Sequence, residues 1–284
     1  MVNLGIAGIN EIVKVFFDGY IFMQFFIILI IDGFLAGMLG GLLGIGGGIV
    51  LMPVLRFVVG LSPAEAAGTC ILAVFFTTLG GTFRHYKLRH INLRSILPVI
   101  AAGMVSTIVF SVFFKSFASK PSWLDLSTGL VFFLLSTGMV IEGLAELRGK
   151  KTVEQMGNEL HGSLAAKLAV GGFAGILPGL LGIGTGAVLV PVFTFILKAP
   201  VKVAIGSSLA CFCANAFLSS SFKLLQGHAI ISAALPLCLG ALIGSNVGAI
   251  VNKRFPTPML KIMFGMTFLY VSSKYIFLFF GVKL

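Results

Sequence analysis

Charged side chains are scarce in this chain. Asp, Glu, Lys and Arg make up 10% of its 284 residues, whereas soluble domains carry about 25%. A soluble fold needs charged groups to cover its surface, so this scarcity excludes an ordinary soluble domain. The nine Asp and Glu residues also form no evident pair inside an apolar run, which argues against a cation pump or an acid–base enzyme.

Motifs for metal binding and nucleophilic catalysis are missing as well. The four cysteines, all within apolar runs, fit neither a zinc motif nor a secreted disulfide framework; they are Cys70, Cys211, Cys213 and Cys238. The chain contains no His-Glu-x-x-His, no Gly-x-Ser-x-Gly and no Asp-rich metal loop. The sequence therefore predicts no catalytic residue, no metal and no cofactor.

What is abundant is apolar sequence. Hydrophobic residues make up 58% of the chain, and the mean hydropathy is +1.09. A spanning helix needs roughly 20 apolar residues, so the length allows about eight to ten passes. Only helices or closed barrels satisfy the backbone within lipid, and the runs here are continuous rather than alternating. We therefore predict an all-α polytopic membrane protein.

The net charge of +11 does not indicate a nucleic-acid partner. The basic residues lie in short clusters between the apolar runs, where cytoplasmic loops of membrane proteins collect Lys and Arg. We expect the clusters at 84–94 and 147–163 to be cytoplasmic. Residues 1–20, which alternate apolar and polar positions at helical spacing, are expected to lie at the membrane interface.

The chain contains an internal repeat. When residues 33–57 are aligned without gaps to residues 171–195, sixteen of the 25 positions are identical. The same offset pairs Gly68 with Gly206, His90 with His228 and Pro98 with Pro236. We therefore predict two homologous copies, at 21–146 and 164–284, joined by a cytoplasmic linker at 147–163.

Each copy is expected to hold about five helical segments. They are 22–44, 48–60, 63–83, 94–115 and 123–146 in the first copy, and 164–182, 186–198, 201–222, 230–251 and 258–281 in the second. The segments at 48–60 and 186–198 are too short for a normal crossing. If all five segments cross, the copies are inverted relative to each other; if each short segment re-enters, there are four passes and the copies are parallel. Loop charge favours the inverted pair by a narrow margin.

A glycine-rich break precedes each short segment: GLLGIGGG at 41–48 and GLLGIGTG at 179–186. Each glycine costs roughly 1 kcal/mol against alanine inside a helix, and an unwound backbone is tolerated only where protein or a wet cavity surrounds it. Backbone N–H groups at a helix start bind anions. The candidate substrate-binding residues here are Gly46, Gly47, Gly48, Gly184, Thr185 and Gly186.

Close helix packing is the alternative explanation for such glycines. It suits Gly37, Gly40, Gly41 and Gly44, whose spacings of three and four place them on one helix face. The consecutive glycines of the two breaks are not needed for a packing face. An anion-binding backbone is therefore the preferred interpretation of the breaks themselves.

The third segment of each copy is rich in hydroxyl and amide groups. Its candidate substrate contacts are Thr69, Thr77, Ser207, Ser208 and Asn215, and the repeat pairs Thr69 with Ser207 and Thr77 with Asn215. Such groups either hold helices together or contact substrate, and the sequence leaves both interpretations open. Arg84 and Lys223, at the ends of these segments, are candidates for the mouth of an anion pathway.

The stretches GMLGGLLGIGGGIVLMPVL and GILPGLLGIGTGAVLVPVF, with Pro53 and Pro191 at matching places, resemble the paired signatures of the TauE/SafE family of sulfite exporter-like membrane permeases. The resemblance implies two facing signatures that build a substrate site near the membrane middle. It also implies transport of sulfite, thiosulfate, sulfoacetate or another sulfonate or organic anion. Thr185 departs from the first copy, which has Gly47, so the two halves of the site are not equivalent.

Together these features predict a transporter, most simply an exporter, in a bacterial-type inner membrane. It would move a small sulfur-containing or organic anion by alternating access. The other partners considered are membrane lipid and a second copy in a homodimer, with no nucleic acid. A passive anion channel with the same site is the alternative, and a membrane-embedded thiol enzyme using Cys211 or Cys213 is the third hypothesis.

Overall fold

The structure, a computed structural model, describes residues 3–148, 160, 162–251 and 257–280, and every regular element in them is helical. Eight of these helices are long and apolar enough to cross a membrane, so the chain is an integral membrane protein. In chain order the elements are α1 (Asn3–Leu43), α2 (Gly48–Pro53), the π-helix η1 (Val54–Val58), α3 (Pro63–Lys87), α4 (Leu93–Ala118), α5 (Pro121–Leu147), α6 (Leu164–Leu181), α7 (Gly186–Phe195), α8 (Val201–Leu225), α9 (Ile231–Val251) and α10 (Thr257–Phe279).

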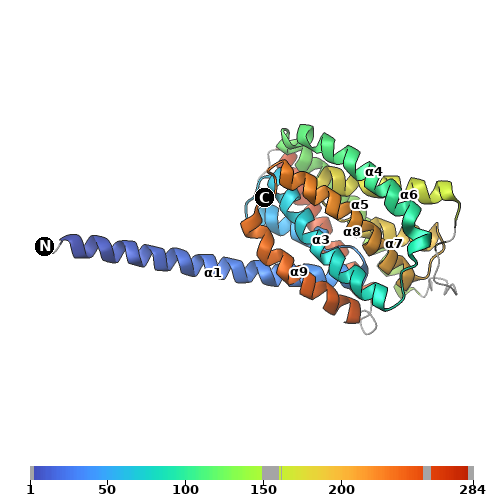
Figure 1. Ribbon diagram of the computed structural model, residues 1–284, viewed down its shortest axis with the longest axis horizontal. Coiled ribbons are helices and arrows are strands. Elements are labelled where there is room, and N and C mark those ends of the chain that lie inside the picture. Colours follow the sequence, from blue (N-terminus) through green and yellow to red (C-terminus); the bar gives the residue numbers. More distant parts are fainter. Residues whose placement is uncertain (1–2, 149–159, 161, 252–256, 281–284) are drawn as a thin grey trace.

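The first helix is longer than the sequence predicted. It runs without a break from Asn3 to Leu43, and Figure 1 shows its first half projecting from the bundle as a straight rod. No helix end therefore separates residues 1–20 from the first repeat, and their interfacial location stays a prediction. The predicted linker at 147–163 lies largely outside the described residues, which exclude 149–159 and 161.

The start of α3 illustrates how local sequence positions a helix. The Ser62 hydroxyl accepts a hydrogen bond from the backbone N–H of Glu65 at 3.3 Å, and the Glu65 carboxylate accepts one from the backbone N–H of Ser62 at 2.9 Å. Pro63 occupies the first turn, where its missing N–H costs nothing. This capping box satisfies two N–H groups that the helix itself leaves unpaired.

Small residues set the closest helix contacts. Three glycines of α1 lie directly against the backbone of three successive turns of α9, pairing Gly33 with Leu237, Gly37 with Ala241 and Gly41 with Ser245. The two residue numbers rise together, so α1 and α9 are parallel. The packing interpretation therefore describes Gly37 and Gly41 well. Gly40 instead lies against the first break, and Gly44 ends the helix with a φ of +75°.

The remaining contacts fix the directions of the other helices. In three helix pairs the numbers of the contacting residues increase together, so the two helices are parallel. These pairs are α6 with α4 (Gly171 with Val99, Gly175 with Gly103), α3 with α9 (Gly68 with His228, Gly80 with Ser245) and α4 with α8 (Gly103 with Asn215, Phe114 with Lys223). In two pairs the residue numbers increase along one helix and decrease along the other, so the helices are antiparallel. These pairs are α3 with α8 (Gly81 with Leu209, His85 with Gly206) and α5 with α10 (Gly129 with Tyr275, Gly143 with Ile262). Thus α1, α3 and α9 point one way, and α4, α6 and α8 point the other way.

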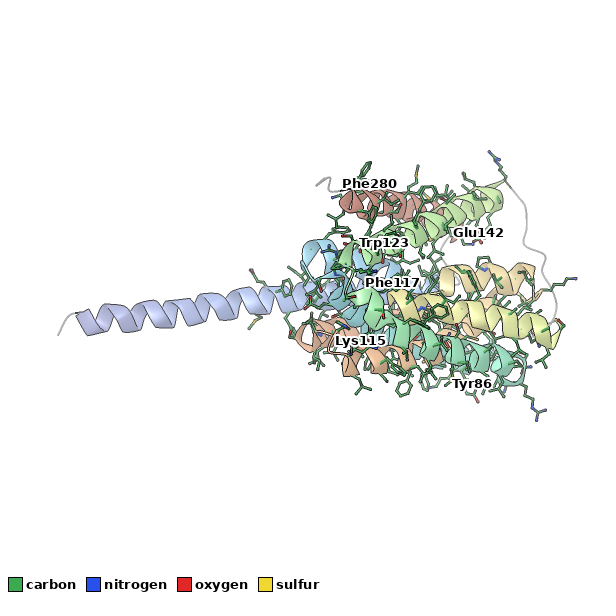
Figure 2. All side chains as sticks on the ribbon, turned by 90° about the horizontal axis from the view of Figure 1, so that it is seen from above. Tyr86, Lys115, Phe117, Trp123, Glu142 and Phe280 are labelled. Atoms are coloured by element: carbon green, nitrogen blue, oxygen red, sulfur yellow. The ribbon has the colours of Figure 1, made fainter. Side chains whose placement is uncertain are left out.

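Corresponding helices of the two predicted copies therefore run in opposite directions. This holds for α1 and α6, α3 and α8, α4 and α9, and α5 and α10, and it is the relation that inverted copies require. Figure 2 shows the ends: Tyr86 and Glu142 lie toward one end of the bundle, and Lys115, Trp123 and Phe280 lie toward the other. The common origin of the copies stays a prediction from the sequence.

Each short helix turns back beside the helix before it. The backbone at Gly46 and Gly47 lies against Gly40, and Gly47 also lies against the carbonyl of Ala36. Because α3 then runs parallel to α1, the chain has returned to its starting end. The sequence analysis tied such re-entry to parallel copies, and this coupling is wrong. The chain enters through α1 and returns through α2 and η1, so these three helices add no net crossing of the membrane. The first copy then has three net crossings, α3, α4 and α5, which is an odd number.

Candidate functional site

The two glycine-rich breaks meet in the interior of the bundle. A Cβ atom on Gly48 would lie 2.9 Å from the backbone nitrogen of Gly184, and a Cβ on Gly186 would collide with the carbonyl of Gly44. Gly184 in turn lies against the carbonyl of Ile45. The two signatures face each other, as the resemblance implies, and their backbones are in van der Waals contact.

The first break needs glycine for its backbone conformation. Gly44, Gly46 and Gly47 have φ values of +75°, +77° and +75°, in the left-handed region where a Cβ atom is strained. The ring of Phe212 fills the space beside Gly46, with its Cδ1 2.8 Å from the place of a Cβ. The same ring borders Gly184, so Phe212 lies between the two breaks.

The second break differs from the first at Thr185. Its φ is −95°, so a threonine fits there without strain, whereas a side chain at Gly47 would meet the Ala36 carbonyl at 2.6 Å. Thr185 precedes the first residue of α7 and is 1% exposed. Its Oγ1 is buried without a hydrogen-bond partner. The asymmetry between the copies therefore follows from backbone geometry.

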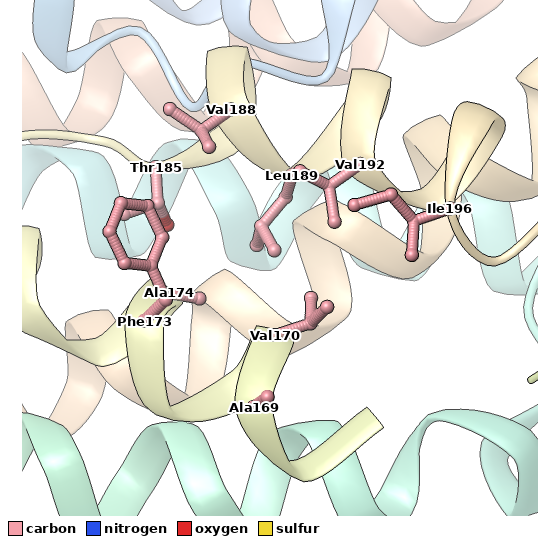
Figure 3. A pocket seen from close by; sticks show the side chains of 9 residues that line it. All are labelled: Ala169, Val170, Phe173, Ala174, Thr185, Val188, Leu189, Val192 and Ile196. Atoms are coloured by element: carbon pink, nitrogen blue, oxygen red, sulfur yellow. The ribbon is translucent and has the colours of Figure 1, made fainter. Parts of the chain in front are cut away.

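A pocket of about 250 Å³ opens beside Thr185, between α6 and α7 (Figure 3). Its walls include Val170 and Ala174 from α6 and Leu189 and Val192 from α7. Apart from the Thr185 hydroxyl the lining is hydrocarbon. This is a candidate binding pocket that the sequence analysis did not foresee, because its walls carry no polar signal.

Three of the predicted polar contacts hold backbone in this conformation. The Thr69 hydroxyl accepts a hydrogen bond from the backbone N–H of Ile230 at 3.0 Å. Thr77 donates to the carbonyl of Ala73 in its own helix at 3.2 Å. Ser208 donates to the carbonyl of Gly44 at 3.0 Å and so ties α8 to the first break.

The other two predicted contacts are unsatisfied. Ser207 is fully buried and Asn215 is 1% exposed. The Ser207 hydroxyl and both polar atoms of the Asn215 amide lack a hydrogen-bond partner. Buried polar atoms are normally paired. The structure thus separates the five candidates into three that hold backbone and two whose buried polar atoms have no partner; their contact with substrate stays a prediction.

Lys223 is completely buried. Its ammonium group donates to the carbonyls of Pro178 at 3.0 Å and Gly179 at 2.9 Å, and to the Ser219 hydroxyl at 2.9 Å. It also lies 4.3 Å from the centre of the Phe114 ring. The two carbonyls belong to the last turn of α6, where a helix favours a cation.

In this conformation Lys223 is therefore enclosed rather than at an opening. Arg84 is half-buried, and its Nε lacks a partner. The Lys223 ammonium group can be enclosed because carbonyls of α6 replace its water. The part of either residue in an anion pathway stays a prediction.

An ion pair that sequence reasoning missed anchors the first short helix. Arg56 in η1 donates from Nε and Nη2 to the two carboxylate oxygens of Asp125 in α5, at 3.0 and 2.8 Å, and from Nη1 to the carbonyl of Leu61 at 3.1 Å. The Tyr275 hydroxyl of α10 donates to the Met52 carbonyl at 3.3 Å. In the sequence these two residues are isolated charges near the ends of two apolar runs, and nothing there indicates that they pair.

The cysteines and the other possible metal ligands of the described residues can be located in the structure. No group of three or more His, Cys, Asp and Glu there could hold a metal ion. The four cysteines are free thiols, with Cys211 buried and Cys213 partly buried. The thiol of Cys70 lies at the first break, with its sulfur 3.6 Å from the Gly48 carbonyl.

Comparison with known proteins agrees with this architecture. Residues 29–275 match the family described as "Sulfite exporter TauE/SafE". A probable membrane transporter protein of Bacillus subtilis, YunE, is 26% identical over 268 residues, which cover 89% of this chain and 97% of that protein. A probable membrane transporter protein of Xylella fastidiosa is 29% identical, over 88% of this chain and 94% of its own length.

A plant protein also matches part of the chain. "Sulfite exporter TauE/SafE family protein 3" of Arabidopsis thaliana is 26% identical over 134 residues, which cover 43% of this chain and 27% of that protein. No solved structure matches. Because the family match spans both breaks and the helices around them, the chain belongs to the sulfite exporter TauE/SafE family.

Proposed function

We propose that this membrane transporter moves a small sulfur-containing or organic anion, such as sulfite, thiosulfate, sulfoacetate or another sulfonate. The observation that carries the proposal is the contact between the two breaks inside the bundle. Broken helices that meet in the interior are the usual substrate sites of secondary transporters. Family membership supports the same conclusion.

The chemistry around the breaks suits an anion. The start of α7 presents backbone N–H groups and a partial positive charge. The hydroxyl of Thr185 at the second break is a buried donor without a partner. Ser207 and Asn215 carry further unpaired buried donors on α8, the helix that contacts the first break through Ser208. In a site shielded from water, such donors hold an anion more strongly than they would in bulk solvent.

Alternating access is the mechanism that we infer. Corresponding helices run in opposite directions, so exchanging the conformations of the two halves would turn the site from one side of the membrane to the other. The halves also differ in restraint. Arg56 ties η1 to α5, whereas the residue at the matching position, Thr194, donates only to Val190 of its own helix at 2.9 Å among the described hydrogen bonds. We infer that α7 moves more readily than α2 and η1.

Binding of anions to the purified protein tests the proposal. A ligand at 100 times its dissociation constant adds about 2.7 kcal/mol to the free energy of unfolding. We expect thermal stabilisation by at least one of sulfite, thiosulfate, sulfoacetate or methanesulfonate, and accumulation of that anion in vesicles. No stabilisation and no accumulation across this panel would contradict the proposal.

Two further measurements separate the alternatives. A passive channel would show flux without saturation and without counterflow, whereas a transporter shows both. A thiol enzyme would lose its function when Cys211 and Cys213 are both replaced by serine. Unchanged transport in that double variant would remove the enzyme hypothesis.

A further inference from the structure

The pocket between α6 and α7 has one polar end and an otherwise apolar lining. Figure 3 shows Thr185 at the start of α7, with its hydroxyl directed into the space toward α6. Along the pocket, Leu189 and Val192 of α7 point toward Val170 and Ala174 of α6, and Val188 lines the pocket beside Thr185. This combination suits a ligand that is itself polar at one end and apolar along the rest.

The polar end is unsatisfied. Thr185 is 1% exposed, and its Oγ1 has no hydrogen-bond partner. It precedes a helix of ten residues, whose first N–H groups lack partners within the helix. A hydroxyl and a helix start that converge at one point can bind an anionic head group.

The apolar part is small. Its volume of about 250 Å³ corresponds to about eight water molecules at ~30 Å³ each, and it is below the ~300–1,000 Å³ typical of pockets for drug-sized ligands. A chain of a few carbon atoms fits this space, whereas a bulky ring system does not. Water would find only one polar group there, so the walls favour hydrocarbon.

We propose that this pocket holds the hydrocarbon part of the transported anion, with the anionic head at Thr185 and the start of α7. The preferred substrates are then short-chain organic anions rather than bare inorganic ones. The inference rests on the proposed transport function and adds the chemical class of the substrate and the location of its tail.

A lipid chain is the competing occupant. Phe173 and Ile196 at the edge of the pocket are 57% and 58% exposed, so the surrounding lipid can reach it. An acyl chain would nevertheless leave the Thr185 hydroxyl unpaired, and an unpaired buried donor is costly. An anion with a short tail satisfies both ends of the pocket.

The first break cannot provide the same head-group contact. Gly47 carries no hydroxyl, and the carbonyl of Ala36 lies where its side chain would be. The short helix that follows is tied to α5 through Arg56 and Asp125. The head-group contact at Thr185 therefore has no counterpart at Gly47, which gives an asymmetric anion one orientation.

A series of straight-chain alkanesulfonates, from methanesulfonate to hexanesulfonate, tests the proposal with the purified full-length protein. Each methylene that enters the pocket should tighten binding by about fourfold, until the pocket is full and the gain stops. Affinity is measured by calorimetry or by thermal stabilisation, in detergent and in phospholipid nanodiscs.

Three variants assign the effect to the pocket. Ala169→Phe and Val192→Phe place a ring in the pocket and should abolish the dependence on chain length, so that hexanesulfonate binds no more tightly than methanesulfonate. Ala165→Phe, one turn earlier on the exposed face of α6, is the matched control and should keep the dependence. Thr185→Val should weaken every member by roughly ten- to a hundredfold without changing the increment per carbon. Thermal unfolding without ligand checks that each variant is folded.

The outcomes are distinguishable. Equal affinity at all chain lengths would overturn this inference and leave the proposed function standing. A gain per carbon that survives both filled-pocket variants would also overturn it. If the gain is seen in detergent but is lost in nanodiscs, a lipid chain occupies the pocket and the inference fails. If no sulfonate binds or is transported, the inference and the proposed function fail together.

Discussion

At the scale of single residues, several polar side chains inside this bundle make hydrogen bonds to backbone carbonyls in place of water. Lys223 replaces its hydration with two carbonyls and a hydroxyl, and Ser208 holds the carbonyl of Gly44. Thr185 and Asn215, in contrast, have no partner. Satisfied groups stabilise the fold, whereas an unsatisfied buried group needs an explanation, and for Thr185 the explanation we propose is a bound anion.

Replacing Lys223 by methionine should lower stability. The buried carbonyl of Gly179 would lose its donor, which costs about 1–3 kcal/mol for a group left unsatisfied. The carbonyl of Pro178 would keep the Ser219 hydroxyl as a donor. A lowered midpoint in thermal unfolding checks this result. Lys202→Met changes an exposed lysine at the start of the same helix and should leave the midpoint nearly unchanged. Equal midpoints for the two variants would contradict the role given to Lys223.

Alanine at Gly46 should be strongly destabilising. Its φ of +77° disfavours a Cβ atom by about 1–2 kcal/mol, and that atom would also press on the Phe212 ring. Gly172→Ala is the matched control, because its Cβ would meet nothing within 4 Å. It should stabilise α6 by about 0.5–1 kcal/mol. Chemical unfolding of both variants in detergent measures the difference, and a similar loss in both would count against the tight first break.

At the scale of elements, the two short helices are held differently. Because α5 and α10 pack mainly against each other, the Arg56–Asp125 pair is a principal link between this helix pair and the first break. The matching position in α7 is Thr194, which has no acid to bind. The two copies thus share a topology, but only the short helix of the first copy is held by an ion pair to α5 among the described contacts.

A double-mutant cycle on Arg56→Gln and Asp125→Asn measures this link. The Asp125 side chain is 5% exposed and the Arg56 side chain is 20% exposed, so we expect a coupling energy of about 1–3 kcal/mol. Lys261 and Glu142, at the other end of the α5–α10 pair, are 18% and 26% exposed at 3.2 Å. Their coupling should be below about 1 kcal/mol. Comparable energies for the two pairs would show that the Arg56 pair is no special anchor.

The sequence was a good guide to helices and to the two breaks, because hydropathy and glycine spacing depend on local composition. It could not show which hydroxyls are satisfied: Thr69 meets Ile230 only through the packing of α3 on α9. It also missed the pocket beside Thr185 and the enclosure of Lys223, since both depend on how α6 lies against α7, α4 and α8. Pairings across the two copies leave no mark in a single sequence.

At the scale of the whole molecule, helix directions decide how the two halves relate. Lys87 ends α3 and Leu225 ends α8, at positions that the repeat makes equivalent. Because α3 and α8 run in opposite directions, these two residues lie at opposite ends of the bundle. Lys120, in the turn after α4, lies at the same end as Leu225, because α4 and α8 are parallel.

Single cysteines at these three positions, introduced into a chain whose four native cysteines are replaced by serine, test this arrangement in cells. Basic residues at 84–94 favour the cytoplasm, so Lys87→Cys should react with a membrane-impermeant maleimide only after permeabilisation. Leu225→Cys and Lys120→Cys should react from outside. Parallel copies would instead expose Lys87→Cys and Leu225→Cys on the same side. Such a result would remove the opposed geometry on which transport by exchange of the two halves depends.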